Sequence, residues 1–301
     1  MKPITILLFG KNGQVGWELQ RSLAPLGDLI ALDFDSQEFC GDFTNLGGLA
    51  KSIRDVAPDV IVNAAAHTAV DKAESEPELA RTINALAPGV LAQEAERLGA
   101  WLVHYSTDYV FDGGGDRPWL EVDMTDPLSV YGKTKLAGEE AIRSAACRHL
   151  ILRTSWVYAA RGGNFAKTML KLAQERDSLK VIDDQVGAPT GADLLADVTA
   201  HAIRTAMQRP EVAGLYHLTA GGQTSWHAYA SFVIDCARQA GVEIKVSPDA
   251  IQAVPTSAFP TVAKRPMNSR LDTTRFQNAF NFKLPHWQTG VSRMLNESLG
   301  K

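Results

Sequence analysis

Residues 4–16 read ITILLFGKNGQVG, a short run rich in apolar side chains that passes into a turn with three glycines. A continuous apolar run of this length is typical of a strand buried on both faces of a parallel sheet. Glycines directly after such a strand permit a tight turn and let the backbone approach a pyrophosphate, which the N-terminus of the next helix binds. The spacing G-x-x-G-x-x-G differs from the usual G-x-G-x-x-G, so an ordinary glycine-rich turn stays open as the alternative.

The first half of the chain continues to alternate apolar runs with helical patterns. Val15, Leu19 and Leu23 recur at helical spacing, which places the first helix at the glycine turn. Strand–helix alternation of this kind predicts an α/β fold with a Rossmann-like doubly wound parallel sheet. We expect further helices at about 46–57, 78–99 and 128–146, and strands at 4–9, 29–33, 60–62, 101–105 and 150–152.

The second half is less regular and predicts a smaller α/β substrate-binding domain. Prolines at positions 255, 260 and 266 indicate an irregular segment over 253–270. The predicted cofactor-binding domain covers residues 1–160, with return segments near 178–195 and 210–225, and residues 161–301 form mainly the substrate-binding domain. Within this half we expect helices at 165–175, 194–207, 226–240 and 287–299, and a strand at 215–218.

The composition argues against several classes of protein. With 301 residues and a formal net charge of −4, the chain has no global basic charge that would indicate nucleic acid as a partner. Its three cysteines, Cys40, Cys147 and Cys236, form no zinc or disulfide pattern, which is typical of thiols in a reducing compartment. No signal peptide is evident, and no apolar stretch approaches the ~20 residues that cross a bilayer. We therefore expect a cytoplasmic protein with no membrane partner.

An acidic residue follows the second predicted strand at the position that a dinucleotide site requires. Asp33 comes 20 residues after Gly13, and an acid about 20 residues beyond the glycines binds the adenosine ribose in such sites. Its carboxylate would repel a 2′-phosphate, which favours NAD over NADP. A solvated strand end is the alternative for Asp33 alone.

A tyrosine and a lysine lie four residues apart at the start of a predicted helix. Tyr131 and Lys135 therefore share one helix face. A free tyrosine has a pKa of about 10, and an ammonium beside it stabilises the phenolate and lowers that pKa. Thr107 ends the fourth predicted strand at the carboxyl edge of the sheet, where such folds bind ligands. A single Y-x-x-x-K match is common by chance, but the glycine turn, ribose acid, strand-end hydroxyl and Tyr/Lys helix occur here in the expected order.

Longer strings carry a more specific signal, and the likeness runs nearly from end to end. They are LFGK at 8–11, QVGWE at 14–18, NAAAHTAVD at 63–71, STDYVF at 106–111, YGKTK at 131–135, RTSWVY at 153–158, DQVGAPT at 184–190 and RPMNSRL at 265–271. In these strings the chain resembles the extended short-chain dehydrogenase/reductases, and most closely the dTDP-4-dehydrorhamnose reductase family.

The resemblance implies reduction of the C4 ketone of dTDP-4-dehydro-β-L-rhamnose to dTDP-β-L-rhamnose with NADH or NADPH. This is the last step of dTDP-L-rhamnose biosynthesis, a route to lipopolysaccharide, and a homodimer is implied. Tyr131 would donate the proton, with Lys135 assisting and Thr107 contacting the substrate. The other implied substrate contacts are Asp108, Trp156, Arg265 and Arg270. The implied cofactor contacts are Gly10, Gly13, Gln14, Val15, Gly16, Asp33, Asp42, Phe43, Ala66, His67, Thr68, Tyr105, Tyr131 and Lys135.

Two further assignments come with the resemblance. His67 invites an acid/base role because histidine titrates near neutral pH, but its place just after the third strand favours backbone contact with the cofactor. The family's Mg²⁺, bound between subunits, would fall on Glu18, Asp193 and Glu297, since oxygen ligands suit this ion. Asp193 is shorter than the glutamate expected there, and surface acids are usually only solvated.

Three alternatives to a reductase are weighed against the residues. A sugar-nucleotide 4,6-dehydratase on this scaffold places an Asp-Glu pair after the strand-four threonine, and here Asp108 is followed by Tyr109. An epimerase on the same scaffold is excluded less firmly. A non-catalytic subunit, like the regulatory subunit of methionine adenosyltransferase, would not need the intact Tyr131 and Lys135.

The segment 264–270 contains the basic residues expected to meet the substrate's diphosphate. Arginine presents a planar and always-charged donor fork to phosphate, and Arg265 and Arg270 lie among prolines that hold the loop in shape. A solvated basic loop is the alternative.

Overall fold

The computed structural model describes residues 3–300, and its largest feature is a six-stranded parallel sheet. The strand order is β10-β5-β4-β3-β1-β2, so the chain passes from β1 to β2 on one side and then to β3 on the other. Such a reversal opens a crevice at the carboxyl ends of the strands, where open α/β sheets bind ligands. The predicted fold class is confirmed. The strands are β1 (Ile4–Phe9), β2 (Gly27–Leu32), β3 (Val60–Asn63), β4 (Trp101–Thr107), β5 (Arg148–Thr154) and β10 (Gly214–His217).

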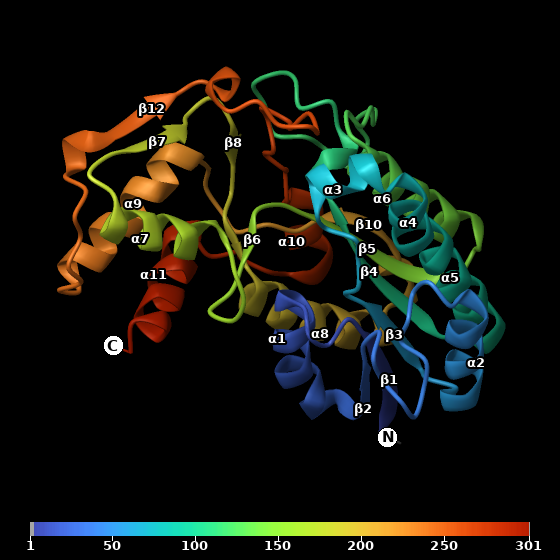
Figure 1. The fold of residues 1–301 in the computed structure, drawn as a ribbon. Helices are drawn as coiled ribbons and strands as arrows, with labels where there is room; N and C mark the ends of the chain where they lie inside the picture. The colour runs from blue at the N-terminus through green and yellow to red at the C-terminus, as the bar shows by residue number, and fades with distance from the viewer. Residues whose placement is uncertain (1–2, 301) are drawn as a thin grey trace.

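Helices cover both faces of this sheet (Figure 1). Because successive strand residues point to opposite faces, Ile6 and Leu8 pack with Leu19 on one face, and Leu7 and Phe9 pack on the other. All five side chains are fully buried. The first face carries α1 (Gln14–Leu23), α8 (Ala192–Gln208) and α10 (Thr274–Phe280), and the second carries α2 (Leu46–Val56), α5 (Ala87–Leu98) and α6 (Val130–Ser144).

Glycine is required at positions 10 and 16 because other backbone atoms lie very close to both. Gly10 has a φ of +86°, and a Cβ there would lie 2.7 Å from the backbone nitrogen of Ala65. Gly16, in the first turn of α1, is so near the turn that a Cβ would lie 1.9 Å from the Gly10 carbonyl oxygen. A side chain at either position would push β1, α1 or the loop after β3 apart.

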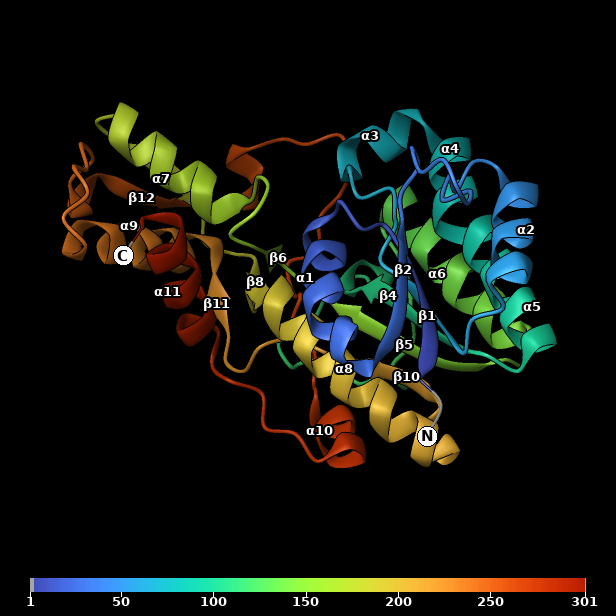
Figure 2. The same ribbon diagram turned by 90° about the horizontal axis from the view of Figure 1, so that it is seen from below.

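A smaller α/β unit packs beside the sheet and has its own core (Figure 2). Tyr229 and Val233 of α9 pack with Trp287 and Val291 of α11. The unit contains α7 (Phe165–Glu175), α9 (Trp226–Gln239), α11 (Trp287–Ser298) and the parallel pair β7 (Leu179–Ile182) and β12 (Ile251–Val254). Short pairs join β6 (Val157–Tyr158) to β9 (Thr190–Gly191) and β8 (Val186–Gly187) to β11 (Thr224–Ser225).

The chain crosses between the two units more than once. After β7, which pairs within the smaller unit, it returns to the sheet with α8 and then β10. The first return therefore begins near residue 192 rather than at the expected 178. A further return, α10, was not expected from the sequence: Phe276 and Phe280 complete the core under the sheet.

Several local elements differ from the expected ones. The long helix expected at 78–99 is divided into α4 (Pro77–Arg81), a π-helical stretch (Thr82–Leu86) and α5, and a short α3 (Val70–Ser75) precedes it. Single 3₁₀ turns lie at Ala24–Leu26, Asp108–Val110, Pro210–Val212, Pro248–Ala250 and Thr256–Ala258. In the described part of the chain, no helix is long and apolar enough to cross a membrane.

Candidate active site

Two adjoining cavities, each of about 380 Å³, lie at the carboxyl edge of the sheet and between the two units. Tyr109 and Trp156 line both of them. The first, which we call the cofactor cavity, is lined by the residues from Gly13 to Val15, by the ends of β3, β4 and β5, and by Tyr131 and Lys135. The second, the substrate cavity, is lined mostly by the smaller unit and by the segment 256–269.

The glycine turn presents the free N-terminus of α1 to the cofactor cavity. Gly13 is the N-cap of α1, and no side chain accepts a hydrogen bond there. Gln14 and Val15 line the cavity, and a Cβ on Gly13 would approach only the Gly10 carbonyl oxygen, at 3.4 Å. Helix N-termini bind phosphate through such unpaired N–H groups. The turn therefore suits the pyrophosphate of a dinucleotide.

Asp33 ties the glycine turn to the end of β2. Its Oδ2 accepts a hydrogen bond from the backbone nitrogen of Asn12 at 2.9 Å, and its Oδ1 accepts one from Phe34 at 2.8 Å. Asp33 lies outside the residues that line the cofactor cavity, as do Asp42 and Phe43. Phe43 packs edge-on against Phe9, and Asp42 accepts hydrogen bonds from Thr44.

The segment after β3 brings three of the expected cofactor contacts together. Ala66 and Thr68 line the cofactor cavity. His67 is held beside them, because its backbone nitrogen donates to Asn84 Oδ1 at 2.8 Å. The His67 ring lies 3.4 Å from Glu76, and the ring is outside the cavity lining.

Tyr131 stands in the first turn of α6, whose start is fixed by Ser129. The Ser129 hydroxyl accepts a hydrogen bond from the backbone nitrogen of Gly132 at 3.2 Å. Burial raises the pKa of the Tyr131 phenol, and a hydrogen bond with Thr107 offsets part of that rise. Lys135 is not among the groups that shift the pKa of Tyr131, so the expected lowering by its ammonium is absent in the cofactor-free protein. Tyr131 is held as a protonated phenol, the form that donates a proton.

Lys135 is buried one turn further along α6. Its side chain is 2% exposed, and its Nζ donates to the Tyr105 carbonyl oxygen at 2.6 Å and lies 3.2 Å from His104 Nε2. Burial lowers the pKa of Lys135 to about 8, against the opposing charge of Glu139. Glu139 is itself paired with Arg153, with oxygen–nitrogen distances of 2.8 and 2.6 Å.

Thr107 and Asp108 close β4 beside the phenol. Thr107 Oγ1 donates to Asp108 Oδ1 at 3.0 Å, and both residues line the cofactor cavity. Burial raises the pKa of the Asp108 carboxyl to about 6. Tyr109 follows in the chain and packs edge-on against Tyr131, with ring centroids 5.5 Å apart. Tyr109 lines both cavities, a role that sequence reasoning missed, although its place after the strand-four threonine was a signal.

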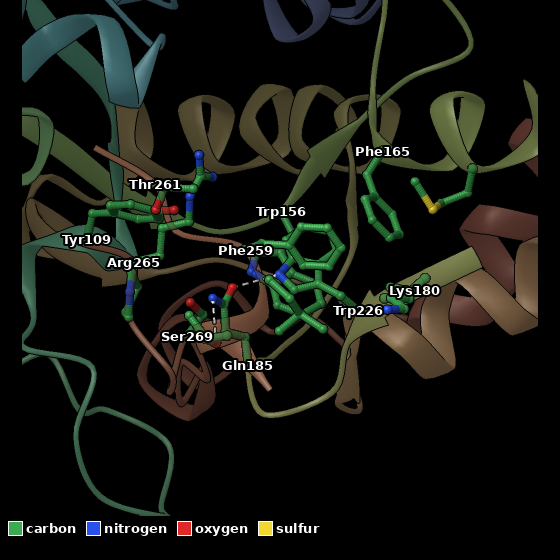
Figure 3. A pocket seen from close by; sticks show the side chains of 15 residues that line it. Tyr109, Trp156, Phe165, Lys180, Gln185, Trp226, Phe259, Thr261, Arg265 and Ser269 are labelled. Carbon is green, nitrogen blue, oxygen red and sulfur yellow. Dashed lines mark hydrogen bonds between the residues drawn. The ribbon is translucent and has the colours of Figure 1, made fainter. Parts of the chain in front are cut away.

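The aromatic wall of the substrate cavity is built by two stacked indoles (Figure 3). Trp156 has a φ of +48°, which is unusual for a bulky residue, and its ring stacks on Trp226 at a centroid distance of 3.6 Å. The Trp226 indole nitrogen donates to Gln185 at 3.0 Å. Sequence reasoning found Trp156 and missed Trp226, at the start of α9, and Gln185, in the loop before β8, because a single aromatic or amide residue at such places carries no distinctive pattern.

The two expected arginines are placed differently. Arg265 lines the substrate cavity, and its Nη2 donates to Asp71 Oδ2 at 2.7 Å. Arg270 is outside that lining, and its Nε donates to Asn268 Oδ1 at 2.8 Å.

The three expected magnesium ligands are not brought together within one chain. Asp193 pairs with Arg293 at 3.0 Å and Glu18 with Arg21 at 3.4 Å. Across residues 3–300, no group of three histidine, cysteine, aspartate or glutamate side chains is arranged to hold a metal ion.

A parallel sheet with this reversal, a glycine turn at its ligand-binding edge and a tyrosine one turn from a buried lysine define an NAD(P)-dependent oxidoreductase of the Rossmann type. Comparison with known proteins narrows the class. The family model described as RmlD substrate binding domain matches residues 4–299. A dTDP-4-dehydrorhamnose reductase of Salmonella typhimurium is 65% identical over 294 residues, which make up 98% of each chain. The chain belongs to the dTDP-4-dehydrorhamnose reductase family.

Two solved structures agree with this assignment. The dTDP-4-dehydrorhamnose reductase of Clostridium acetobutylicum superposes with a TM-score of 0.87 and 36% identity, covering 99% of this chain and 100% of that one. The enzyme of the same name from Bacillus anthracis, in complex with NADP, superposes with a TM-score of 0.86 and 31% identity over the same shares.

Proposed function

We propose that the protein reduces the C4 ketone of dTDP-4-dehydro-β-L-rhamnose to the alcohol of dTDP-β-L-rhamnose, using NADH or NADPH. The observation that carries this proposal is that Tyr131, Lys135 and Thr107 line the same cavity as the glycine turn. The proton donor Tyr131 and the phosphate-binding N-terminus of α1 therefore line the same cofactor cavity. The adjoining substrate cavity opens from the same place, at Tyr109 and Trp156.

The residues of the cofactor cavity suit a nicotinamide dinucleotide. The unpaired N-terminus of α1 at Gly13 would hold the pyrophosphate, and Gln14 and Val15 would lie along it. Lys135 is one of the lining residues, and its Nζ would donate to the nicotinamide ribose. The bound dinucleotide supplies the hydride.

Tyr131 supplies the proton in this proposal. Its buried phenol stays protonated at neutral pH because burial raises its pKa. The phenol oxygen gives its proton to the ketone oxygen as that oxygen gains negative charge. The Thr107 hydroxyl, which lines the same cavity as Tyr131, would hold the same substrate oxygen. General acid catalysis of this kind contributes roughly 10²–10⁴-fold to the rate.

The substrate cavity would bind the nucleotide and its diphosphate. Trp156 and Trp226 offer a flat apolar wall, and Arg265 offers the charged donor fork that phosphate prefers. The acid that now pairs with Arg265, Asp71, is half-exposed, so the arginine can exchange this partner for a phosphate at little cost.

The assembly and location are proposed from the resemblance. The protein would act as a cytoplasmic homodimer, and Glu18, Asp193 and Glu297 would meet Mg²⁺ only across the interface of two chains. The pairing of Asp193 with Arg293 competes with that role.

The test is to incubate the protein with dTDP-4-dehydrorhamnose and NADPH, and separately with NADH, and to follow the absorbance of the reduced cofactor. Consumption of cofactor that depends on the sugar nucleotide, together with formation of dTDP-rhamnose, supports the proposal. Cofactor consumption without that product, or no consumption with either nucleotide, contradicts it.

A further inference from the structure

A carboxylate outside both cavities bonds the helix turn that carries the proton donor. The backbone nitrogen of Val130, the first residue of α6, donates to Glu74 Oε1 at 2.8 Å. Tyr131 is the next residue of that turn. Glu74 lies on α3, 56 positions earlier in the chain, and it is not among the residues that line the cofactor or the substrate cavity. The proton transfer proposed for Tyr131 does not use it.

The start of a helix is held less firmly than its middle. The first backbone N–H groups have no carbonyl oxygen within the helix that could accept their hydrogen bonds. At the start of α6, side-chain oxygens accept in their place: Ser129 Oγ from Gly132, and Glu74 from Val130. Ser129 belongs to the same turn and moves with it, whereas Glu74 comes from another helix. Glu74 therefore fixes where the turn lies relative to the rest of the site.

The helix that presents Glu74 is itself anchored. Asp71 and Glu74 are three residues apart and share one face of α3. Asp71 Oδ1 accepts from the backbone nitrogen of Ala263 at 3.1 Å, and Oδ2 pairs with Arg265. The helix also packs against α6 (Figure 1). One short helix thus connects the turn of the proton donor with the segment 256–269, which lines the substrate cavity.

This anchoring bears on the rate because proton transfer depends on alignment. A proton donor must lie within hydrogen-bond reach of the substrate oxygen. A displacement of about 1 Å can cost on the order of 10²-fold in rate. Because Tyr131 follows Val130 directly, fraying of the turn at Val130 displaces the phenol.

We propose that Glu74 is a positioning residue for the reduction: it anchors the first turn of α6 to α3 and so holds the Tyr131 phenol in line with the substrate oxygen. The inference rests on the proposed function. The bond to Val130 needs an acceptor at the right distance, so the reach of the side chain matters more than its charge. Glutamine keeps the acceptor and the reach, whereas aspartate keeps the charge and is one methylene shorter.

The first test uses this difference. Glu74→Gln should keep kcat within about threefold of wild type, and Glu74→Asp should lower kcat by about tenfold or more. The Kd for NADH should stay within about twofold in both variants, because the glycine turn is untouched. Glu78→Ala is the matched control, since Glu78 is an exposed acid on the neighbouring α4. Equal kcat values for the Gln and Asp variants overturn the proposal.

A double-mutant cycle separates positioning from structural support. Once Tyr131 is replaced by phenylalanine, no donor remains to be aligned, so Glu74→Asp should then lower kcat by less than about twofold. A purely structural role would reduce the active fraction, and with it kcat, by the same factor with and without Tyr131→Phe. Equal losses in the two backgrounds overturn the proposal.

Amide hydrogen exchange of the cofactor-free protein tests the anchor without turnover. The Val130 amide should be protected in wild type and in Glu74→Gln, and should exchange about tenfold faster in Glu74→Asp because local opening of the turn costs less. Wild type with this protection but without reduction of the dTDP-sugar would count against the reductase function alone. Equal exchange in wild type and Glu74→Asp overturns the proposal. Unprotected Val130 in wild type also overturns it, even if a variant does not fold.

Discussion

Arg265 and Asp71 form an ion pair that joins the substrate-side segment to α3 of the sheet domain, with 2.7 Å between Arg265 Nη2 and Asp71 Oδ2. The two residues are 194 positions apart in the chain. Because both are partly exposed, the pair adds little to stability. Arg265 is the one cation of the segment 264–270 that lines the substrate cavity. The ion pair therefore orients its guanidinium before a diphosphate binds.

Arg265→Ala should raise the KM for the dTDP-sugar at least tenfold and leave the Kd for NADH within about twofold. A tenfold change corresponds to ~1.4 kcal/mol, a modest value for a charge-assisted hydrogen bond. Arg270→Ala is the matched control, and we expect a smaller effect because its guanidinium bonds Asn268 outside the cavity lining. Equal weakening of cofactor and substrate binding would indicate misfolding, and an unchanged KM would remove Arg265 from the site.

Tyr131→Phe should remove most of the turnover, by roughly 10²–10⁴-fold, and leave cofactor binding nearly unchanged. The phenyl ring keeps its edge-on contact with Tyr109, while the proton is lost. Steady-state kinetics and fluorescence titration with NADH measure the two quantities. Turnover within threefold of wild type would contradict the assignment of Tyr131 as the proton donor.

Removal of the Asp33 charge should shift the preference toward NADPH, because the carboxylate repels a 2′-phosphate. Asp33→Asn is the sharper variant, since an amide oxygen can still accept from the backbone nitrogen of Asn12. Asp33→Ala removes that bond too and should loosen the glycine turn. The ratio of kcat/KM for NADPH over NADH is the readout, and an unchanged ratio in both variants would show that Asp33 does not read the ribose.

Asp108 should make the protein less stable as pH rises from about 4 to 6. Its folded-state pKa of about 6 lies above its ordinary ~3.9, so the folded protein binds more protons than the unfolded chain in this window. The neutral carboxyl of Asp108 contributes fully to stability below the ordinary pKa of ~3.9. This contribution is lost as the pH rises to the folded-state pKa of about 6, a change of about 3 kcal/mol. Asp108→Asn removes this titration while keeping an acceptor for Thr107.

Chemical denaturation of both proteins between pH 4 and pH 7 measures that difference. The free energy of unfolding of wild type should fall relative to that of Asp108→Asn as the pH rises. Parallel pH dependences would show that Asp108 titrates normally.

Gly16→Ala should destabilise the protein by about 1–3 kcal/mol and weaken dinucleotide binding, because the new Cβ would meet the Gly10 carbonyl oxygen at 1.9 Å. Gly163→Ala is the control, since a Cβ there has no atom within 4 Å. Thermal unfolding and NADH titration compare the two. Similar behaviour of both variants would mean that α1 moves away from the turn without cost.

Local patterns were enough to predict the sheet and most of its helices. The run at 4–9 and the helices at 165–175 and 226–240 lie within one residue of the elements observed, because apolar periodicity records directly which face is buried. The missed elements α3 and α10 are short, and their stability comes from contacts with distant segments rather than from their own pattern. The same reason explains why the expected return at 178 was misplaced: β7 pairs with β12, about 70 residues further along the chain.

The sequence by itself determined the fold class, the glycine turn and the order of Asp33, Thr107, Tyr131 and Lys135, because each depends on neighbours within a few residues. Only the tertiary structure decided that Lys135 meets His104, that Arg265 rather than Arg270 lines the substrate cavity, and that burial raises the pKa of Tyr131. Hydrogen-bond direction and desolvation depend on groups that only folding brings together, and no spacing in the chain records them.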